Sequence, residues 1–143
     1  MDHGIDTGFL VAAEVLDHPN HHAAWTILSE IIAAGDHLAL APQVLAEFIH
    51  VVTDPRRFAT PLTMEAARDL AQKWWSARDV RQVVADAGAT TLFFTWHRTH
   101  ELGRKRILDT LLAATYRNAG IKSLLTTNPR DFAILGGFQC TVP

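Results

Sequence analysis

The chain alternates between short apolar runs and longer stretches in which apolar residues recur at helical spacing. Residues 38–41 form an apolar run between Asp36 and Pro42 that is too short for a helix, so it predicts a buried strand. The next stretch places its apolar residues on one helical stripe, at Val44, Leu45, Phe48, Val51 and Val52. This stripe predicts an amphipathic helix, and Pro42 suits its first turn.

The same two patterns predict the remaining elements. Strands are expected to end at Asp6 and to span residues 80–84, 121–125 and 138–142, the last of them at an edge of the sheet. Helices are expected over residues 9–15, 20–34, 63–77, 87–100, 107–118 and 129–134. Asn20 and Thr63 are expected to cap helix starts, and Gly35 and Gly120 to follow helix ends. Alternating strands and helices predict an α/β fold, a three-layer α/β/α sandwich with a central, mainly parallel sheet.

Aromatic residues are expected mainly in packing roles. Trp25, Trp96 and the pair Phe93-Phe94 are expected in the core. Trp74 and Trp75 are adjacent on a predicted helix and therefore point in different directions. That arrangement favours packing or a dimer contact over stacking on RNA bases.

Composition changes this picture little. The 143 residues are 48% hydrophobic and 20% charged with a net charge of −2, which is ordinary for a globular domain and excludes disorder. No linker-like segment divides the chain, so a single domain over residues 1–143 is expected. Cys140 is the only cysteine, which excludes an internal disulfide. Without a signal-peptide pattern or a long apolar stretch, the protein is expected to be cytoplasmic, with no membrane partner.

The basic residues leave a nucleic-acid partner open, because a local patch can hold phosphates even on an acidic protein. The larger cluster is Arg104-Lys105-Arg106, and a smaller one is Arg56-Arg57. The larger cluster could bind RNA phosphates or form a solvated turn. The histidines at 18, 21 and 22 lie across a Pro-Asn turn rather than on one helical face, which argues against a zinc site.

Acidic and amide side chains fall where an α/β sheet binds its ligands, just beyond the carboxyl ends of the strands. These are Asp6 after the first strand, Glu47 in the helix after the second, Asp109 near the start of a late helix, and Asn128 and Asp131 after the last central strand. Clustered carboxylates repel one another unless a cation neutralises them, and oxygen ligands suit Mg²⁺ or Mn²⁺. Such an ion makes bound water easier to deprotonate, and that water can attack a phosphodiester.

Each of these residues also has a plainer interpretation when taken alone. Asp6 could cap the helix after it, and Glu47 could be solvated on a helix edge. Asp109 could pair with the basic cluster at 104–106. A phosphatase of the haloacid-dehalogenase type also has an Asp after its first strand, but it needs a second Asp where this chain has Gly8.

Four segments carry a family resemblance, in order, along nearly the whole chain. They read IDTGFLVAA at 5–13, LALAPQVLAEF at 38–48, RILDTLLAAT at 106–115 and LLTTNPRDF at 124–132. They resemble the four motifs of the PIN domain, most closely in its VapC-like toxins. The stretch DHPNHHAA at 17–24 is similar to the loop that follows the first motif.

The resemblance implies a metal-dependent endoribonuclease that hydrolyses RNA phosphodiesters with a metal-activated water. It carries roles as ligands of Mg²⁺ or Mn²⁺ onto Asp6, Glu47 and Asp109. It further implies the toxin of a toxin–antitoxin pair, with a cognate antitoxin and a homodimer. Many members have an Asp at the position of Asn128, and Asp131 is expected to take over part of that catalytic role.

Contacts to RNA are expected from Thr7, Arg104, Arg106, Thr126 and Asn128. The hydroxyls of Thr7, Thr126 and Thr127 could bond the carboxylates or the scissile phosphate, or these residues could simply be β-branched residues that end strands. Because Asn128 lacks charge, a second interpretation is a catalytically degenerate PIN-fold module that binds RNA or a protein partner without cleavage.

Overall fold

Five short strands form one sheet in the computed structural model, which describes residues 1–143. The strands are β1 (Asp2–Ile5), β2 (His37–Leu40), β3 (Val80–Gln82), β4 (Ser123–Leu125) and β5 (Gln139–Thr141). They lie in the order β3-β2-β1-β4-β5, and every neighbouring pair is parallel. The expectation of a mainly parallel sheet is confirmed, and β5 is an edge strand as predicted.

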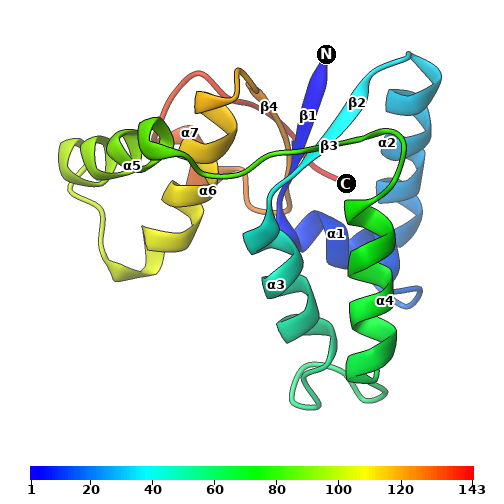
Figure 1. Ribbon diagram of the computed structural model, residues 1–143. Helices are drawn as coiled ribbons and strands as arrows, with labels where there is room; N and C mark the ends of the chain where they lie inside the picture. Colours follow the sequence, from blue (N-terminus) through cyan, green and yellow to red (C-terminus); the bar gives the residue numbers. More distant parts are fainter.

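Helices cover both faces of this sheet (Figure 1). They are α1 (Thr7–Glu14), α2 (His21–Ala33), α3 (Pro42–Val52), α4 (Met64–Trp75), α5 (Ala87–Thr99), α6 (Ile107–Asn118) and α7 (Arg130–Ala133). Helices α1 to α4 pack against one another on one side, and α5 to α7 form a second group on the other (Figure 1). This is the three-layer α/β/α sandwich expected from the sequence. The longest helices, α2 and α5, have 13 residues each, and none of the helices could cross a membrane.

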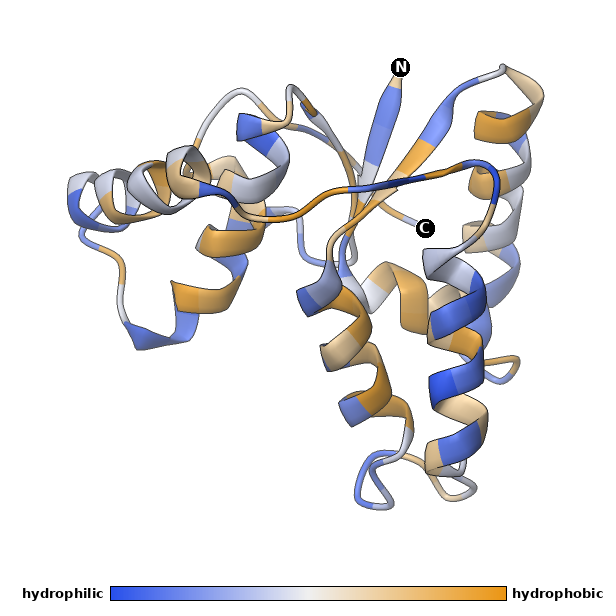
Figure 2. Ribbon diagram, in the orientation of Figure 1, coloured by the Kyte–Doolittle hydropathy of each residue, from blue (hydrophilic) through white to orange (hydrophobic).

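The core lies between the sheet and its two helical layers. Phe9 of α1 and Phe48 of α3 are completely buried, and Figure 2 shows α1 and one side of α3 coloured as hydrophobic. Tyr116 of α6 is also completely buried, and its hydroxyl donates to the carbonyl of Ile5 at 2.6 Å. A Cβ at Gly4 would lie 2.8 Å from the Tyr116 ring. Glycine at this position therefore lets the ring of α6 pack directly on β1.

The helix boundaries follow the expected caps, with one exception. The Thr63 hydroxyl accepts a hydrogen bond from the backbone N–H of Ala66 at the start of α4. Gly35 and Gly120 follow helices with φ of +79° and +82°, a left-handed conformation that glycine adopts without strain. Asn20 is the N-cap residue of α2, as expected, but its side chain makes no capping hydrogen bond.

Two aromatic residues expected in the core lie at the surface instead. Trp25 is 44% exposed and Phe94 is 60% exposed. The indole N–H of Trp25 donates to the carbonyl of Ala13 at 2.6 Å, which holds the ring against α1 while much of it stays in solvent. Trp96 is half-buried and packs edge-on against Phe138. Hydrophobicity predicts burial only on average, whereas the side of the helix on which a residue falls decides it.

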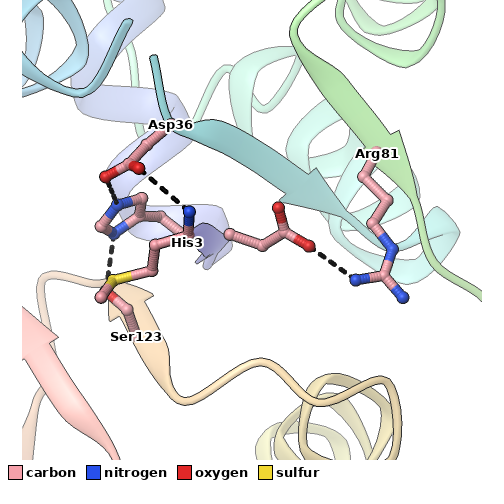
Figure 3. Close-up of polar contacts among 6 residues, drawn as sticks. His3, Asp36, Arg81 and Ser123 are labelled. Atoms are coloured by element: carbon pink, nitrogen blue, oxygen red, sulfur yellow. Dashed lines mark hydrogen bonds and ion pairs between the residues drawn. The ribbon is translucent and has the colours of Figure 1, made fainter. Parts of the chain in front are cut away.

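Polar contacts tie together the amino-terminal ends of the strands (Figure 3). His3 of β1 contacts the Ser123 hydroxyl of β4 through Nδ1 at 2.7 Å. Its Nε2 contacts the carboxylate of Asp36, which precedes β2, at 3.1 Å. Arg81 of β3 donates to Asp2 of β1 at 2.6 Å. These contacts link four of the five strands at the edge of the sheet opposite the carboxyl ends.

Candidate functional site

Four carboxyl side chains converge at the carboxyl edge of the sheet. Asp6 directly follows β1, and Glu47 lies in α3 after β2. Asp109 lies in the first turn of α6, and Asp131 lies in α7 after β4. The charges of Glu47 and Asp131 raise the pKa of Asp6, and those of the other three acids raise the pKa of Asp109. The fold thus brings together the acids of four separate sequence segments.

Asp6 is held in one orientation by two hydrogen bonds. Its Oδ1 accepts from the backbone N–H of Thr7 at 2.8 Å, and its Oδ2 accepts from the hydroxyl of Thr126 at 2.7 Å. Asp6 is therefore both the N-cap of α1 and a member of the acidic cluster. The two roles that the sequence suggested for it as alternatives occur together. Burial is the main cause that raises its pKa, and the two hydrogen bonds only partly offset that effect.

Asp109 carries the largest electrostatic penalty of the cluster. Burial, followed by the charges of Asp6 and Asp131, raises its pKa to about 7. A hydrogen bond with the Asp131 side chain contributes in the same direction. The Arg106 guanidinium pairs with Asp131 at 3.0 Å, so the basic cluster neutralises Asp131 and not Asp109. The site as a whole lacks positive charge at its centre.

The donor chemistry of the site fits a hard divalent cation. All its ligand atoms are carboxylate, hydroxyl or amide oxygens, which suit Mg²⁺ or Mn²⁺. However, no three acidic, histidine or cysteine side chains lie close enough together to hold one ion directly. Of the three expected ligands, Asp6 is buried, Asp109 is half-buried and Glu47 is exposed. Mg²⁺ keeps several waters and needs only one or two carboxylates, a requirement that Asp6 and Asp109 can meet.

A cavity of about 660 Å³ opens on these acids. Asp6, Glu47 and Asp109 line it near the sheet, and Arg57 and Phe58 line it from the loop between α3 and α4, which lies at the end of α3 away from the sheet (Figure 1). Thr7 and Asn128 also line it, as expected of residues that could contact a substrate. The Thr7 hydroxyl is buried and has no hydrogen-bond partner, which leaves it available to a group inside the cavity.

The structure changes the expected set of RNA contacts. Thr126 is fully buried, and its hydroxyl donates to Asp6 and accepts from the backbone N–H of Asn128. Its hydroxyl thus bonds a carboxylate, one of the two partners expected for it, and the expected contact with RNA is wrong because Thr126 does not reach the surface. Arg106 is half-buried in its pair with Asp131. Arg104 is exposed and does not line the cavity.

The residues at the far end of the cavity were not among those predicted to form the site. Arg57 belongs to the smaller basic cluster noted in the sequence, which was its only signal. Phe58, His18 and Asn20 also line this end. Nothing in the sequence indicates that these three residues share a cavity, because the loop after α3 and the turn before α2 meet only in the folded chain.

A second cavity, of about 350 Å³, lies between α3 and α6 on the other side of Glu47 and Asp109. Its walls are mostly apolar and include Val44 and Leu111. Leu108 at its edge is 68% exposed, which is unusual for a large apolar side chain. The acidic site is therefore flanked by an apolar groove.

Comparison with known proteins agrees with this architecture. The family model of the PIN domain matches residues 5–137. Ribonuclease VapC24 of Mycobacterium tuberculosis is 29% identical over 134 residues, which cover 92% of this chain and 90% of that protein. The solved structure of VapBC2 from Rickettsia felis bound to a DNA fragment from their promoter has a TM-score of 0.73 at 18% identity, and the match covers 100% of this chain and 99% of that one. A toxin–antitoxin complex from Klebsiella pneumoniae has a TM-score of 0.65 at 14% identity, and covers 96% of this chain and 95% of that one.

Proposed function

Because the chain belongs to the PIN domain family, we propose that it is a metal-dependent endoribonuclease and the toxin of a toxin–antitoxin pair. Its relative VapC24 bears the name of a ribonuclease over nearly the full length of both chains. The similar chain from Klebsiella pneumoniae belongs to a toxin–antitoxin complex. The substrate is RNA, and the reaction is hydrolysis of a phosphodiester within the chain.

One observation carries the proposal: Asp6, Glu47 and Asp109 line an open cavity at the carboxyl edge of a parallel sheet, and the pKa values of Asp6 and Asp109 are raised. A structural cluster would be neutralised by salt bridges, but only Asp131 has one here. Leaving Asp6 and Asp109 without a cationic partner costs stability, and that cost is typical of a functional site. A divalent ion would remove it.

Mg²⁺ or Mn²⁺, when bound, would offset the charge that develops on the phosphoryl oxygens and make water a better nucleophile. Asp6 and Asp109 are the residues that would hold the ion, and Thr126 orients Asp6 for that role. The exposed carboxylate of Glu47 is free to accept a proton from the attacking water. Asp131 supports Asp109 through their hydrogen bond.

Two protein partners belong to the same proposal, a cognate antitoxin and a second copy of the chain. The apolar groove between α3 and α6 supports a protein partner beside the site, because Leu108 exposes most of its side chain there. Light scattering of the purified chain, alone and with the product of an adjacent small gene, tests both. A monomer that binds no such product would contradict this part of the proposal.

The decisive experiment incubates antitoxin-free protein with total RNA in Mg²⁺, in Mn²⁺ and in EDTA. Asp6→Asn is compared with Asp69→Asn, which changes an exposed carboxylate on α4 in the same way. We expect cleavage that needs a divalent ion, leaves a 5′-phosphate, and is lost in Asp6→Asn but kept in Asp69→Asn. Folded protein that binds RNA without cleavage under all conditions would instead identify a degenerate binding module.

A further inference from the structure

The far end of the 660 Å³ cavity differs in chemistry from the acidic end. Arg57 is the only lysine or arginine that lines the cavity, and Phe58 lies next to it. Both belong to the loop between α3 and α4, whereas the acids belong to β-strand ends and to α3 and α6. The cavity therefore runs from a cluster of negative charge to a single positive charge.

The loop that carries Arg57 is held in place. The backbone N–H groups of Arg57 and Phe58 both donate to the carbonyl of Asp54, at 3.1 and 3.2 Å. The N–H of Leu62 donates to the carbonyl of Val52 at 2.9 Å, which closes the loop on the end of α3. Because α3 also carries Glu47, one rigid element sets the spacing between Arg57 and the acidic cluster.

The Arg57 guanidinium retains free binding capacity. Its Nε lies 3.7 Å from Asp54, and its two terminal nitrogens make no hydrogen bond or ion pair within the chain. The side chain is 60% exposed, so a ligand can reach it. A planar guanidinium with free donors is well suited to a phosphate, which it can bind with two parallel hydrogen bonds.

The other residues at this end suit the sugar or base of a nucleotide. Phe58 is half-buried and packs against the core, which fixes its position. His18 accepts a hydrogen bond from the backbone N–H of Asn20 at its Nδ1, at 3.0 Å. In the neutral ring the proton then lies on Nε2, which leaves a donor for a polar group of the ligand. An apolar wall beside a polar donor is typical of sites that hold one unpaired nucleotide.

From this arrangement we propose that Arg57, Phe58 and His18 form a subsite for the nucleotide next to the cleaved bond in single-stranded RNA, with Arg57 on its phosphate. The inference rests on the proposed ribonuclease function and adds the residues that hold the nucleotide beside the acids. It replaces Arg104 and Arg106 as the main RNA contact, because Arg106 is engaged by Asp131 and Arg104 does not line the cavity.

Arg56 offers a matched control for Arg57. It is the preceding residue, has the same charge and bonds the same Asp54, through Nε at 3.2 Å. Its side chain is 85% exposed and does not line the cavity. A general effect of positive charge would therefore appear equally in Arg56→Ala and Arg57→Ala, whereas a specific contact would appear only in the second.

The test measures binding of a short fluorescent single-stranded RNA, and of its duplex form, to protein that carries Asp6→Asn so that no cleavage occurs. We expect Arg57→Ala to weaken binding of the single strand roughly tenfold and to reduce the slope of log Kd against log salt by about 0.7, the value for one phosphate contact. Arg56→Ala should remain within about twofold of the parent. Phe58→Leu, which keeps an apolar side chain for packing, should weaken binding of the single strand with no change in the salt slope.

Equal losses in Arg57→Ala and Arg56→Ala, or equally tight binding of the duplex, would overturn the proposal. So would an unchanged Kd in Arg57→Ala protein whose Tm equals that of the parent. These outcomes are independent of the proposed function, which is judged by cleavage in the wild-type chain. If the wild-type chain cleaves RNA but Arg57→Ala has no effect on binding, the nuclease proposal stands and the subsite proposal fails. If binding depends on Arg57 but the wild-type chain does not cleave RNA, the subsite proposal stands and the nuclease proposal fails.

Discussion

The hydroxyl of Thr126 donates a hydrogen bond to Oδ2 of Asp6 at 2.7 Å, joining the residue after β4 to the residue after β1. Thr126 is fully buried and Asp6 is 7% exposed, so the bond is shielded from water. The other oxygen of the Asp6 carboxylate faces the N–H of Thr7. The two bonds leave the carboxylate little freedom to rotate, which favours a ligand that must be held in one geometry.

Removing this hydrogen bond should impair the site more than the fold. We expect Thr126→Val to lower both cleavage and Mn²⁺ affinity by about 10- to 100-fold, the usual effect of losing a residue that orients a ligand. Thr126→Ser keeps the donor and should restore most of both. Titration calorimetry with Mn²⁺ and single-turnover cleavage are the measurements. Thr115→Val is the control, because Thr115 is also buried but bonds the backbone carbonyl of Leu111 in its own helix; an equal loss in that variant would show that the effect is not specific to Asp6.

A methyl group at Gly8 should displace a residue of the cavity wall. A Cβ there would overlap the hydroxyl oxygen of Thr127, so Gly8→Ala must push that side chain aside. We expect cleavage to fall at least about tenfold, the loss that misplaced site residues cause, with a Tm within a few degrees of the parent. Gly103→Ala is the matched control, because φ at Gly103 is −89° and nothing lies near its added Cβ. Full activity in Gly8→Ala would mean that Thr127 has no part in the site.

The raised pKa of Asp109 predicts how stability depends on pH in protein stripped of metal. Its pKa is about 7 when folded and near 4 when unfolded, so between those values the folded chain holds more protons and loses stability as pH rises. We expect the Tm of wild-type protein in EDTA to fall from pH 5 to pH 8. Asp109→Asn removes the charge and should flatten this fall, which raises Tm at pH 8 by about 2–4 °C, or roughly 1 kcal/mol.

A bound divalent ion should offset the loss of stability that the wild-type chain shows as pH rises. Mg²⁺ or Mn²⁺ should raise the Tm of the wild-type chain more at pH 8 than at pH 5.5, because binding requires the deprotonated carboxylate. The shift should be much smaller in Asp109→Asn at both pH values. A Tm of wild-type protein that does not respond to either ion at pH 8 would contradict the assignment of Asp109 as a ligand.

Arg106 and Asp131 should act as one unit. Their ion pair at 3.0 Å holds Asp131 beside Asp109, so Arg106→Gln and Asp131→Asn both disturb the same contact. We expect each to lower cleavage several-fold and the double variant to be no worse than the more damaged single one. Arg104→Gln, which changes an exposed arginine two residues away, should have little effect. Additive losses in the double variant would show that Arg106 acts independently, for example by binding RNA directly.

The order of elements and the acidic positions could be predicted because their signals are local. The apolar run at 38–41 and the stripe on α3 reflect backbone periodicity over a few residues, and the glycines at 35 and 120 reflect the left-handed conformation that follows a helix end. A parallel sheet then places the ends of its strands at one edge, which is why Asp6, Glu47, Asp109 and Asp131 could be grouped without coordinates. The predicted strand ends differ from the structure. Strands β3 and β4 are each shorter than predicted, because the length of a strand is set by its pairing with neighbouring strands.

What the sequence by itself determined was therefore the fold class, the family resemblance and the set of acids. Only the tertiary structure decided what each neighbouring side chain does. Thr126 bonds Asp6, Arg106 pairs with Asp131, and Arg57 reaches the cavity. These relationships join residues from segments far apart in the chain. They depend on how closely and at what angles the helices and strands pack. Periodicity is a property of neighbours along the chain, whereas a hydrogen bond between distant segments is a property of packing, so the first can be read from the sequence and the second cannot.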